Sequence, residues 1–449
     1  MVGEMRFDLA AGDIEVFTLQ ISTPGLGDHS YAVFVNGSAY LIDPQRDIDR
    51  FTRIVEEQGA ALAAVYETHI HNDYISGGPL LVDRLGGVYV LPENSGSELP
   101  HHVVADGDRA DLAGGWSFIA IHTPGHTPHH MSYALLSPGG DRAVFTGGSM
   151  LVGAVGRSDL LSAELTEPLA RDQYHSVRRL AAELSDPTLV APTHGAGSFC
   201  SASTVAATTS TIGEEKLRNP ALLAGTEDEF VISQLANYRL YPTYYREMGP
   251  ANVAGRPAIP SDDLARLEID DPVLADAVIV DLRPAEAWAG SHIPGSINIP
   301  AGDSVGVYAG WVFPWNTPLV LGGSDDQVAA ARLHLARIGY DQVVGTIDPT
   351  VSPDGVSVRI ASFAELRAEH PAVIVDTRDP LEFGDGAVPG AVNIHMSEIP
   401  TRVEELPTTD PVWLYCETGY RASVSAGFVA ASGRTVVLVR DRFGAQTWN

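Results

Sequence analysis

The feature that most constrains this chain is an internal repeat in its second half. Residues 278–300 read VIVDLRPAEAWAGSHIPGSINIP, and residues 373–395 read VIVDTRDPLEFGDGAVPGAVNIH. Aspartate, arginine, proline, glycine and asparagine recur at one constant spacing of 95 positions. Each copy is followed by an apolar stretch, an amphipathic stretch and a second apolar stretch, which predicts a strand, a helix and a strand. The repeat therefore predicts two α/β domains with parallel sheets, over residues 258–347 and 358–449.

The first half of the chain follows another pattern. Short β-rich runs fill residues 13–45, with a hairpin turn signal at Asn36-Gly37 between two of them. An amphipathic helix is predicted over about 48–58, and strands and helices alternate to about residue 215. Residues 212–250 look helical, and the Pro/Gly-rich stretch 249–260 is typical of a linker. We expect one layered α/β domain over residues 1–250.

Composition excludes several classes of partner and compartment. The formal charge of −29, with no stripe of basic residues, disfavours binding to nucleic acid or anionic lipid. No run approaches the roughly 18 apolar residues of a membrane span, and the N-terminus lacks the basic start and apolar stretch of a signal peptide. Two cysteines cannot form a disulfide framework, so we expect reduced thiols in the cytoplasm.

Cys416 closes an apolar strand, WLYC, and a helix is predicted to begin at Ala422. A thiol there faces the positive end of the helix dipole and unpaired backbone N–H groups, and Arg421 adds a cation. These effects stabilise thiolate over thiol, and the same N–H groups can hold a persulfide sulfur or an oxyanion. The alternative is an inert core cysteine, but the strand–CxxGxR–helix context favours catalysis. The loop between cysteine and arginine is Glu417, Thr418, Gly419 and Tyr420.

The pattern VDxR, PGAxNI and YCxxGxR resembles the rhodanese homology domain, a sulfurtransferase module. The resemblance implies that Asp376 and Arg378 form a buried pair that orients the active loop, with an architectural role. In the first copy Gly323 stands where the cysteine should be and Val328 replaces the arginine. That copy cannot carry a persulfide. It is either a docking or shaping partner or a degenerate duplication that only packs.

A second candidate site is a set of histidines that follow predicted strands in the first half. His69, His71 and Asp73 share one loop, His126 lies in HTPGHTPHH, and His194 lies in APTHGAGSFC. Neutral imidazoles and a carboxylate that converge at strand ends are what a divalent metal needs. A lone histidine would more often be structural, but this clustering predicts a metal site. His122 is expected to be structural, because Pro124 and Gly125 fix a tight turn beside it.

The first domain resembles the metallo-β-lactamase fold, an αββα sandwich, and within it the persulfide dioxygenases, many of which carry rhodanese domains. The shared segments include LIDPQRDID, ETHIHNDY, HTPGHTPHH, VFTGG, VGRSDL and PTHGAGSFC. Two positions depart from the family. The motif HxHxDH ends here in Tyr74, and the usual aspartate of FTGD is Gly148. The resemblance also places Arg157 near the pocket, as a partner of the carboxylate of a thiol substrate; the alternative is a surface ion-pair residue.

These departures leave three options for the metal. A mononuclear site on His69, His71 and His126 would hold Fe(II) in preference to Zn(II). Asp73 or Tyr74 would supply an oxygen ligand in the second option, and the domain would bind no metal in the third. Only Asp73 and His194 remain of a second metal site, so a two-metal hydrolase is not expected. Cys200, just past the last histidine, is expected to be buried.

The leading hypothesis is an enzyme of sulfur metabolism. The first domain would oxidise a low-molecular-weight thiol persulfide with O₂, and Cys416 would transfer sulfane sulfur from a persulfide or thiosulfate. One alternative is a zinc-dependent thioester hydrolase similar to glyoxalase II. The other is a sulfur-relay protein with an inactive first domain. The sequence leaves the metal, the thiol and the choice between a monomer and a homodimer open.

Overall fold

The structure is a computed structural model of the whole chain, and it describes residues 4–9, 14–201, 205–351 and 355–446. The chain divides into two compact units. The first is formed by Met1–Tyr241 with Tyr245–Ile259, and the second by Pro242–Tyr244 with Pro260–Asn449. Among the described residues, no helix combines the length and apolarity needed to cross a bilayer.

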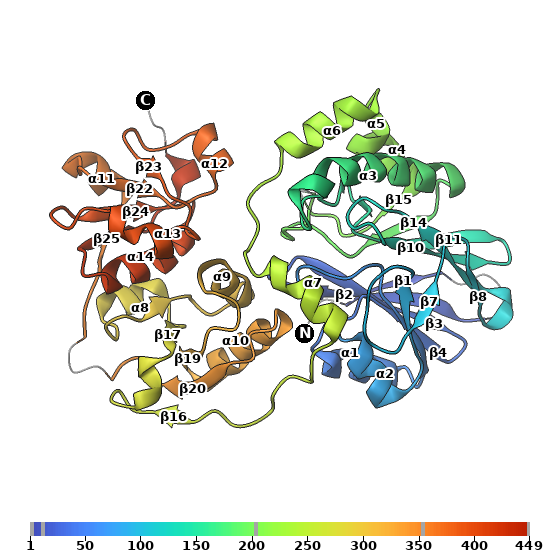
Figure 1. Cartoon of the computed structure of the whole chain (residues 1–449), viewed down its shortest axis with the longest axis horizontal. Coiled ribbons are helices and arrows are strands. Elements are labelled where there is room, and N and C mark those ends of the chain that lie inside the picture. The colour runs from blue at the N-terminus through green and yellow to red at the C-terminus, as the bar shows by residue number, and fades with distance from the viewer. Residues whose placement is uncertain (1–3, 10–13, 202–204, 352–354, 447–449) are drawn as a thin grey trace. The chain divides into compact units, whose positions relative to one another are not determined.

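The first unit is built on two sheets (Figure 1). In spatial order, one contains β1 (Glu4–Asp8), β2 (Val16–Thr23), β3 (Asp28–Val35), β4 (Ser38–Ile42), β5 (Ala61–Tyr66), β6 (Val88–Pro92) and β7 (His102–Val104). The other contains β15 (Ser210–Thr211), β14 (Leu189–Pro192), β11 (Gly140–Gly147), β10 (Met131–Ser137), β9 (Ser117–His122) and β8 (Arg109–Asp111). A separate small hairpin pairs β12 (Met150–Leu151) with β13 (Ala154–Val155).

Helices cover the outer faces of both sheets, so the first unit has four layers (Figure 1). α1 (Ile48–Glu57) and α2 (Gly78–Leu85) pack on the first sheet. The second sheet is covered by α3 (Ala163–Glu183), α4 (Ile212–Arg218), α5 (Pro220–Leu223) and α6 (Glu227–Ala236). Tyr31, Tyr66, Phe118 and Tyr133 fill the core between the sheets. The predicted αββα sandwich is confirmed, and the hairpin turn falls at Asn36-Gly37, where both residues have positive φ.

The predicted linker over 249–260 is wrong in its first half. α7 (Tyr245–Ala254) continues through Gly249 and Pro250. Tertiary contacts override these helix-breaking residues, because the buried side chain of Asn252 binds the loop that follows β5. Its amide accepts from the backbone N–H of Ser76 at 2.8 Å and donates to the carbonyls of His71 and Tyr74 at 2.9 and 2.8 Å.

The second unit contains two five-stranded sheets in which every strand pair is parallel. The first sheet has the order β16 (Arg266–Leu267), β20 (Val343–Ile347), β19 (Leu319–Gly322), β17 (Val278–Asp281) and β18 (Ile297–Asn298). Its helices are α8 (Ala285–Gly290), α9 (Val305–Val312) and α10 (Asp325–Arg337).

The second repeat has the same strand order, as its sequence predicts: β21 (Arg359–Ala361), β25 (Val436–Val439), β24 (Val412–Tyr415), β22 (Ile374–Asp376) and β23 (Val392–Asn393). Its helices are α11 (Phe363–Glu369), α12 (Pro380–Asp385), α13 (Ile399–Arg402) and α14 (Tyr420–Ala431). Short 3-10 turns occupy Ala113–Gly115 in the first unit and Pro272–Ala275 in the first repeat. Two more lie in the second repeat, at Val403–Glu405 and Phe443–Ala445. We call the first copy the Cys-less repeat and the second the Cys416 repeat.

Candidate functional sites

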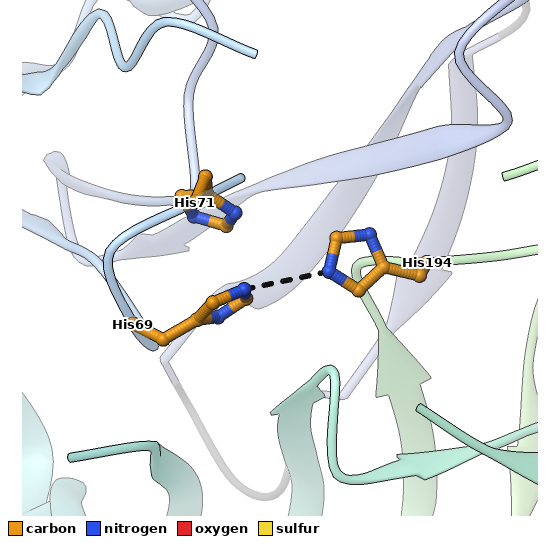
Figure 2. Close-up of side chains that lie close together, drawn as sticks. All are labelled: His69, His71 and His194. Atoms are coloured by element: carbon orange, nitrogen blue, oxygen red, sulfur yellow. Dashed lines mark hydrogen bonds between the residues drawn. The ribbon is translucent and has the colours of Figure 1, made fainter. Parts of the chain in front are cut away.

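The histidines of the first unit converge at one end of the sandwich. His69 and His71 lie in the loop after β5, and His194 lies in the loop after β14 (Figure 2). His126 joins them from the loop between β9 and β10, with its ring 4.7 Å from that of His69 and 5.1 Å from that of His194. All four side chains are fully buried. Ligand atoms of His69, His71 and His194 lie within 4.8 Å of one another, as do those of His126, His194 and Cys200.

Three of these rings are held by their Nδ1 atoms, so that Nε2 faces the site. His194 Nε2 lies 3.5 Å from His69 Nε2 (Figure 2), and His126 Nε2 is buried with no hydrogen-bond partner among the described residues. A ring anchored at one nitrogen with the other left bare is the usual state of a metal-binding histidine. The anchors are Thr68 Oγ1 for His69 (2.9 Å), the Arg157 carbonyl for His126 (2.8 Å) and Asp28 Oδ1 for His194 (2.9 Å).

His71 has a different environment from the other three. Its Nε2 lies 3.2 Å from Asp43 Oδ1, 3.2 Å from Glu67 Oε2 and 3.1 Å from the Tyr74 hydroxyl. Burial lowers the pKa of His71, but the charges and hydrogen bonds of Asp43 and Glu67 outweigh burial and raise it well above 6.5. Its Nε2 is therefore occupied within the chain. Only Nδ1, which is buried and without a hydrogen bond among the described residues, faces away from these carboxylates.

Two of the other rings, those of His69 and His126, are neutral, which is the state in which imidazole binds a metal. Burial lowers the pKa of His126 to about 3 and that of His69 well below 6.5. Burial also opposes charge on His194, but Asp73 and Asp28 raise its pKa to about 9. Asp73 Oδ2 lies 3.2 Å from His194 Nδ1. The neutral imidazoles of His69 and His126, with one orphaned Nε2, fit a divalent metal, and His194 must release its proton to join them.

The two departures from the family pattern have structural consequences. A Cβ atom on Gly148 would lie 2.2 Å from Cδ2 of His126, so the ring of His126 fills the space of a side chain at 148. The backbone N–H of Gly148 donates to His130 Nε2 at 3.0 Å. Tyr74, in place of a histidine, donates its hydroxyl hydrogen to the carbonyl of Asp43 at 3.1 Å. Neither position supplies a second metal ligand.

The donors of the Arg157 guanidinium are engaged within the chain. Its Nε and Nη2 bind the carboxylate of Asp159 at 2.6 and 2.8 Å, and further N–H groups donate to the carbonyls of Phe199 and Arg239. Arg157 also lines a cavity of about 580 Å³ beside the loop that follows His194. The geometry matches the ion-pair alternative, but the pair is buried, and the Arg157 carbonyl positions His126.

The other sequence candidates of the first unit have structural partners. His122 Nε2 contacts the Pro128 carbonyl at 3.0 Å, and His129 Nε2 accepts from the N–H of Ile70 at 2.9 Å. Cys200 is fully buried, and burial, with the charges of Asp73 and Asp28, raises the pKa of its thiol well above 9. Cys200 is therefore a thiol, not a thiolate, when no metal is bound.

In the second unit, Cys416 lies directly after β24 and is 2% exposed. Its Sγ accepts a hydrogen bond from the backbone N–H of Gly419 at 3.1 Å. α14 begins at Tyr420, two residues before the predicted start, with Gly419 as its N-cap. Gly419 has φ 87° and no side chain to cap the helix, and the first turn contains no acidic residue. The N–H of Gly419 therefore meets the sulfur at a helix start that no side chain caps.

The cation of this loop is held by a carboxylate that the sequence motifs did not indicate. Both terminal nitrogens of Arg421 bind the carboxylate of Glu382 in α12. The two side chains are 19% and 22% exposed. Glu417 turns the other way, and its carboxylate accepts from the N–H of Gly444 at 3.0 Å. Thr418 is exposed at the tip of the loop.

Both repeats contain the same group of three polar residues, an aspartate and an arginine at the end of the second strand of the repeat and an asparagine in the strand beside it, which we call the clasp. In the Cys416 repeat, Arg378 binds Asp376 through Nε and Nη2, and Asn393 Nδ2 donates to the carbonyls of both residues. In the Cys-less repeat the same contacts join Arg283, Asp281 and Asn298. The clasp does not touch a reacting atom, which supports an architectural role.

Sheet register identifies the residue that replaces the cysteine. Asp376 pairs with Tyr415, and Asp281 pairs with Gly322, so Gly323 stands in the place of Cys416. α10 starts sooner after its strand than α14 does, because its N-cap, Ser324, follows Gly323 directly. Counted from the N-cap, the helix position of Arg421 is therefore taken by Asp326 and not by Val328, which is buried further along α10.

Comparison with known proteins agrees with this division. The rhodanese-like domain model matches residues 262–348 and 360–443, and the metallo-beta-lactamase superfamily model matches residues 24–194. The human mitochondrial persulfide dioxygenase ETHE1 is 32% identical over 196 residues, which are 43% of this chain and 69% of that protein. A hydroxyacylglutathione hydrolase of Chromohalobacter salexigens is 33% identical over 154 residues, 34% of this chain and 56% of that protein. A crystal structure titled as a metallo-beta-lactamase from Staphylococcus aureus covers 75% of this chain and 99% of its own, with 29% identity and a TM-score of 0.68.

Proposed function

From the premise that this chain belongs to the metallo-β-lactamase/rhodanese fusion family related to persulfide dioxygenases, we propose a sulfur-metabolism enzyme with two activities. The first unit oxidises a low-molecular-weight thiol persulfide with O₂. The products are the free thiol and sulfite, and the balance is RSSH + O₂ + H₂O → RSH + SO₃²⁻ + 2H⁺. The second unit transfers sulfane sulfur through Cys416. The compartment proposed for it is a reducing cytoplasm, a proposal supported by the low cysteine content.

In the first unit, His69, His126 and His194 would hold one divalent metal through Nε2, with Nδ1 of His71 alongside. Fe(II) fits the proposed oxidation better than Zn(II), because a bound ferrous ion would supply the chemistry of O₂ activation. The chain fixes the three rings by their Nδ1 anchors, and the buried loops around them exclude bulk water. The cavity beside Arg157 has room for the carrier thiol of the persulfide.

The observation that carries the sulfurtransferase proposal is the contact of Cys416 Sγ with an uncapped helix end. The thiolate attacks the outer sulfur of the donor, an Sγ–S bond forms, and the donor S–S bond breaks with its electron pair on the departing thiolate. The amide groups of the loop then hold the terminal sulfur of the persulfide. A later acceptor nucleophile takes that sulfur and restores the Cys416 thiolate.

A zinc-dependent thioester hydrolase is the second candidate, favoured by the similarity to hydroxyacylglutathione hydrolases. The loss of ligands at Tyr74 and Gly148 argues against a two-metal hydrolase. Elemental analysis of the purified protein separates the candidates: iron supports oxidation, zinc supports hydrolysis, and absence of metal supports a sulfur relay.

The dioxygenase proposal is tested by O₂ consumption with glutathione persulfide. We expect His194→Ala to remove bound metal and O₂ uptake together, because His194 is a ligand in this proposal. His175→Ala is the matched control, because His175 is exposed on α3. An iron-loaded protein that consumes no O₂ with this substrate would refute the proposal for the first unit.

The sulfurtransferase proposal is tested by cyanide-dependent thiocyanate formation from glutathione persulfide or thiosulfate. We expect Cys416→Ser to abolish it and Cys200→Ser to leave it unchanged. Full activity in Cys416→Ser would reject sulfur transfer through this residue.

A further inference from the structure

The Cys-less repeat packs against the part of the Cys416 repeat that binds sulfur. The ring of Tyr308, in α9, lies 4.4 Å from the ring of Tyr420, the first residue of α14. One turn further along α9, Trp311 meets the ring of His395 edge-on at 4.8 Å. α9 therefore lies beside the helix end that contacts Cys416.

Hydrogen bonds from the same repeat hold this helix end in place. The Tyr420 hydroxyl donates to the carbonyl of Pro300 at 2.8 Å. One turn into α14, the buried hydroxyl of Ser423 donates to Oδ1 of Asn298, whose amide nitrogen belongs to the clasp of the Cys-less repeat. The cysteine loop and the Cys-less repeat thus form one continuous structure, and the side chain of Tyr308 is fixed relative to the loop.

The hydroxyl of Tyr308 makes no hydrogen bond with any residue in the described part of the chain. Two other tyrosine hydroxyls do: Tyr420, at this contact, donates to Pro300, and Tyr340, elsewhere in the Cys-less repeat, donates to the carbonyl of Phe313 at 2.8 Å. The hydroxyl is not one of the buried polar atoms that lack a partner, so solvent reaches it. The ring of Tyr308 is partly exposed, so the free hydroxyl can meet a molecule from solvent.

The charges around Tyr308 are those of the cysteine loop. Its pKa is raised to about 12, chiefly by burial; Arg421 opposes this increase, and Cys416 and Glu382 add to it. The hydroxyl therefore stays protonated at neutral pH and remains a hydrogen-bond donor. A donor beside a negatively charged sulfur stabilises charge that develops during transfer.

We propose that Tyr308, from the repeat that lacks a cysteine, is a substrate-positioning residue that donates a hydrogen bond to the departing thiolate when Cys416 takes sulfur from an organic persulfide. This rests on the proposed sulfurtransferase function. The step is Cys416–S⁻ + R–S–SH → Cys416–S–SH + R–S⁻, in which the new Sγ–S bond replaces the donor S–S bond. The proton stays on the transferred sulfur, and R–S⁻ carries the electron pair that Tyr308 stabilises. The Cys-less repeat is then part of the active site.

The test compares Tyr308→Phe with the wild type on persulfides whose leaving thiols differ in acidity: 2-mercaptoethanol, glutathione and trifluoroethanethiol. Cyanide is the acceptor, and kcat/KM is measured for each donor. We expect a loss of about 10- to 100-fold with the glutathione donor, the range for a hydrogen bond to a charged group. The loss should shrink as the leaving thiol becomes more acidic, because a weaker base needs less stabilisation.

The dependence on leaving group is a ratio within one protein, so it cancels any change in the fraction of folded enzyme. A loss that is equal for all three donors, or below twofold for all of them, would overturn the role of Tyr308. Tyr340→Phe is the matched control, since it removes a hydroxyl from the same repeat and should leave the ratio unchanged. Activity that persists in Cys416→Ser would defeat the proposed function itself, whereas a normal Tyr308→Phe beside an inactive Cys416→Ser defeats only this inference.

Discussion

The Cys416 repeat and the Cys-less repeat share their strand order and their clasp. They differ at the N-terminal end of the helix that follows the fourth strand of each repeat in chain order, α14 in the Cys416 repeat and α10 in the Cys-less repeat. In the Cys416 repeat, the N-cap of α14 is Gly419, which has no capping side chain and whose N–H donates to the sulfur of Cys416. In the Cys-less repeat, Ser324 caps α10, and the side chain of Gln327 returns the bond in a capping box. Two acidic residues, Asp325 and Asp326, occupy the first turn of α10.

This difference shows how one scaffold gains or loses an anion site. The amide groups at a helix start attract an anion unless the chain satisfies them itself. In α10 the side chain of Ser324 accepts from a free amide group, and two carboxylates in the first turn offset the positive end of the helix dipole. This helix start therefore attracts no further anion. In α14 no side chain caps the helix start, and Arg421 adds positive charge. The absence of a cysteine at position 323 therefore goes together with a helix start that the chain itself satisfies.

The largest effect is expected when the reactive atom is moved between the repeats. Cys416→Ser should abolish thiocyanate formation, and adding Gly323→Cys should not restore it. A side chain at 323 starts 3.0 Å from Oε1 of Gln327 and follows no loop of open amides. Restored activity in the double variant would show that the helix cap does not decide the difference between the repeats.

A smaller but still large effect is expected at the second residue after the N-cap, which is Arg421 in α14 and Asp326 in α10. Arg421→Gln should lower kcat/KM for sulfur transfer about 10- to 100-fold, because it removes a charged partner and leaves Glu382 unpaired beside the sulfur. Arg421→Asp, which copies Asp326 of the Cys-less repeat, should lower it further. Asp326→Asn is the control and should leave thiocyanate formation unchanged. Equal activity in Arg421→Asp and the wild type would contradict the electrostatic account.

The repeats should also differ in their response to acid. Burial, with the charge of Arg421, lowers the pKa of His395 to about 4, and Pro300 stands at the matching position of the Cys-less repeat. Because the unfolded imidazole titrates near pH 6.5, the stability that His395 contributes is present above that pH and is lost as pH falls toward 4. From pH 7 to pH 5 we expect a loss of about 2 kcal/mol in the free energy of unfolding.

Urea denaturation followed by tryptophan fluorescence measures this loss, with His395→Asn as the variant. Asparagine keeps an acceptor for Ser397 but does not titrate. The pH sensitivity should fall by that amount in the variant. The same pH dependence in both proteins would show that His395 is not its source.

The smallest effect concerns the cap itself. Ser324→Ala should lower the free energy of unfolding by about 1 kcal/mol, the usual cost of an N-cap. Sulfur transfer should stay within twofold of the wild type, since Ser324 does not touch the cysteine loop. Thermal unfolding and thiocyanate formation measure the two outcomes, and a large loss of activity would mean that the Cys-less repeat is coupled more tightly to Cys416 than the contacts indicate.

Most of the fold was predictable from the sequence because its signals are local or repeated. The constant spacing of 95 positions predicted two domains of the same fold, and Asn36-Gly37 predicted the hairpin between β3 and β4. The linker was misplaced because Asn252 stabilises α7 through contacts with residues about 180 positions away.

The sequence motifs predicted the residues of the candidate sites, but not the residues that hold them in position. The histidine motifs and the CxxGxR loop named residues that the structure places in two clusters. Their partners lie far along the chain: Asp28 is 166 positions from His194, and Glu382 is 39 positions from Arg421. Tyr308 belongs to the repeat that lacks the reactive cysteine. No local pattern links such pairs, so only the folded chain shows them.

The clasp has a consequence for how the chain acquires its structure. Its asparagine bonds span only 15 and 17 positions in each repeat, so each clasp closes a short loop at low entropic cost. Contacts of this range form early, and each repeat can therefore organise its own sheet as it leaves the ribosome, before the two assemble. We expect Asn298→Ala to slow refolding of the second unit in stopped-flow fluorescence, and an unchanged rate would show that the clasp forms late.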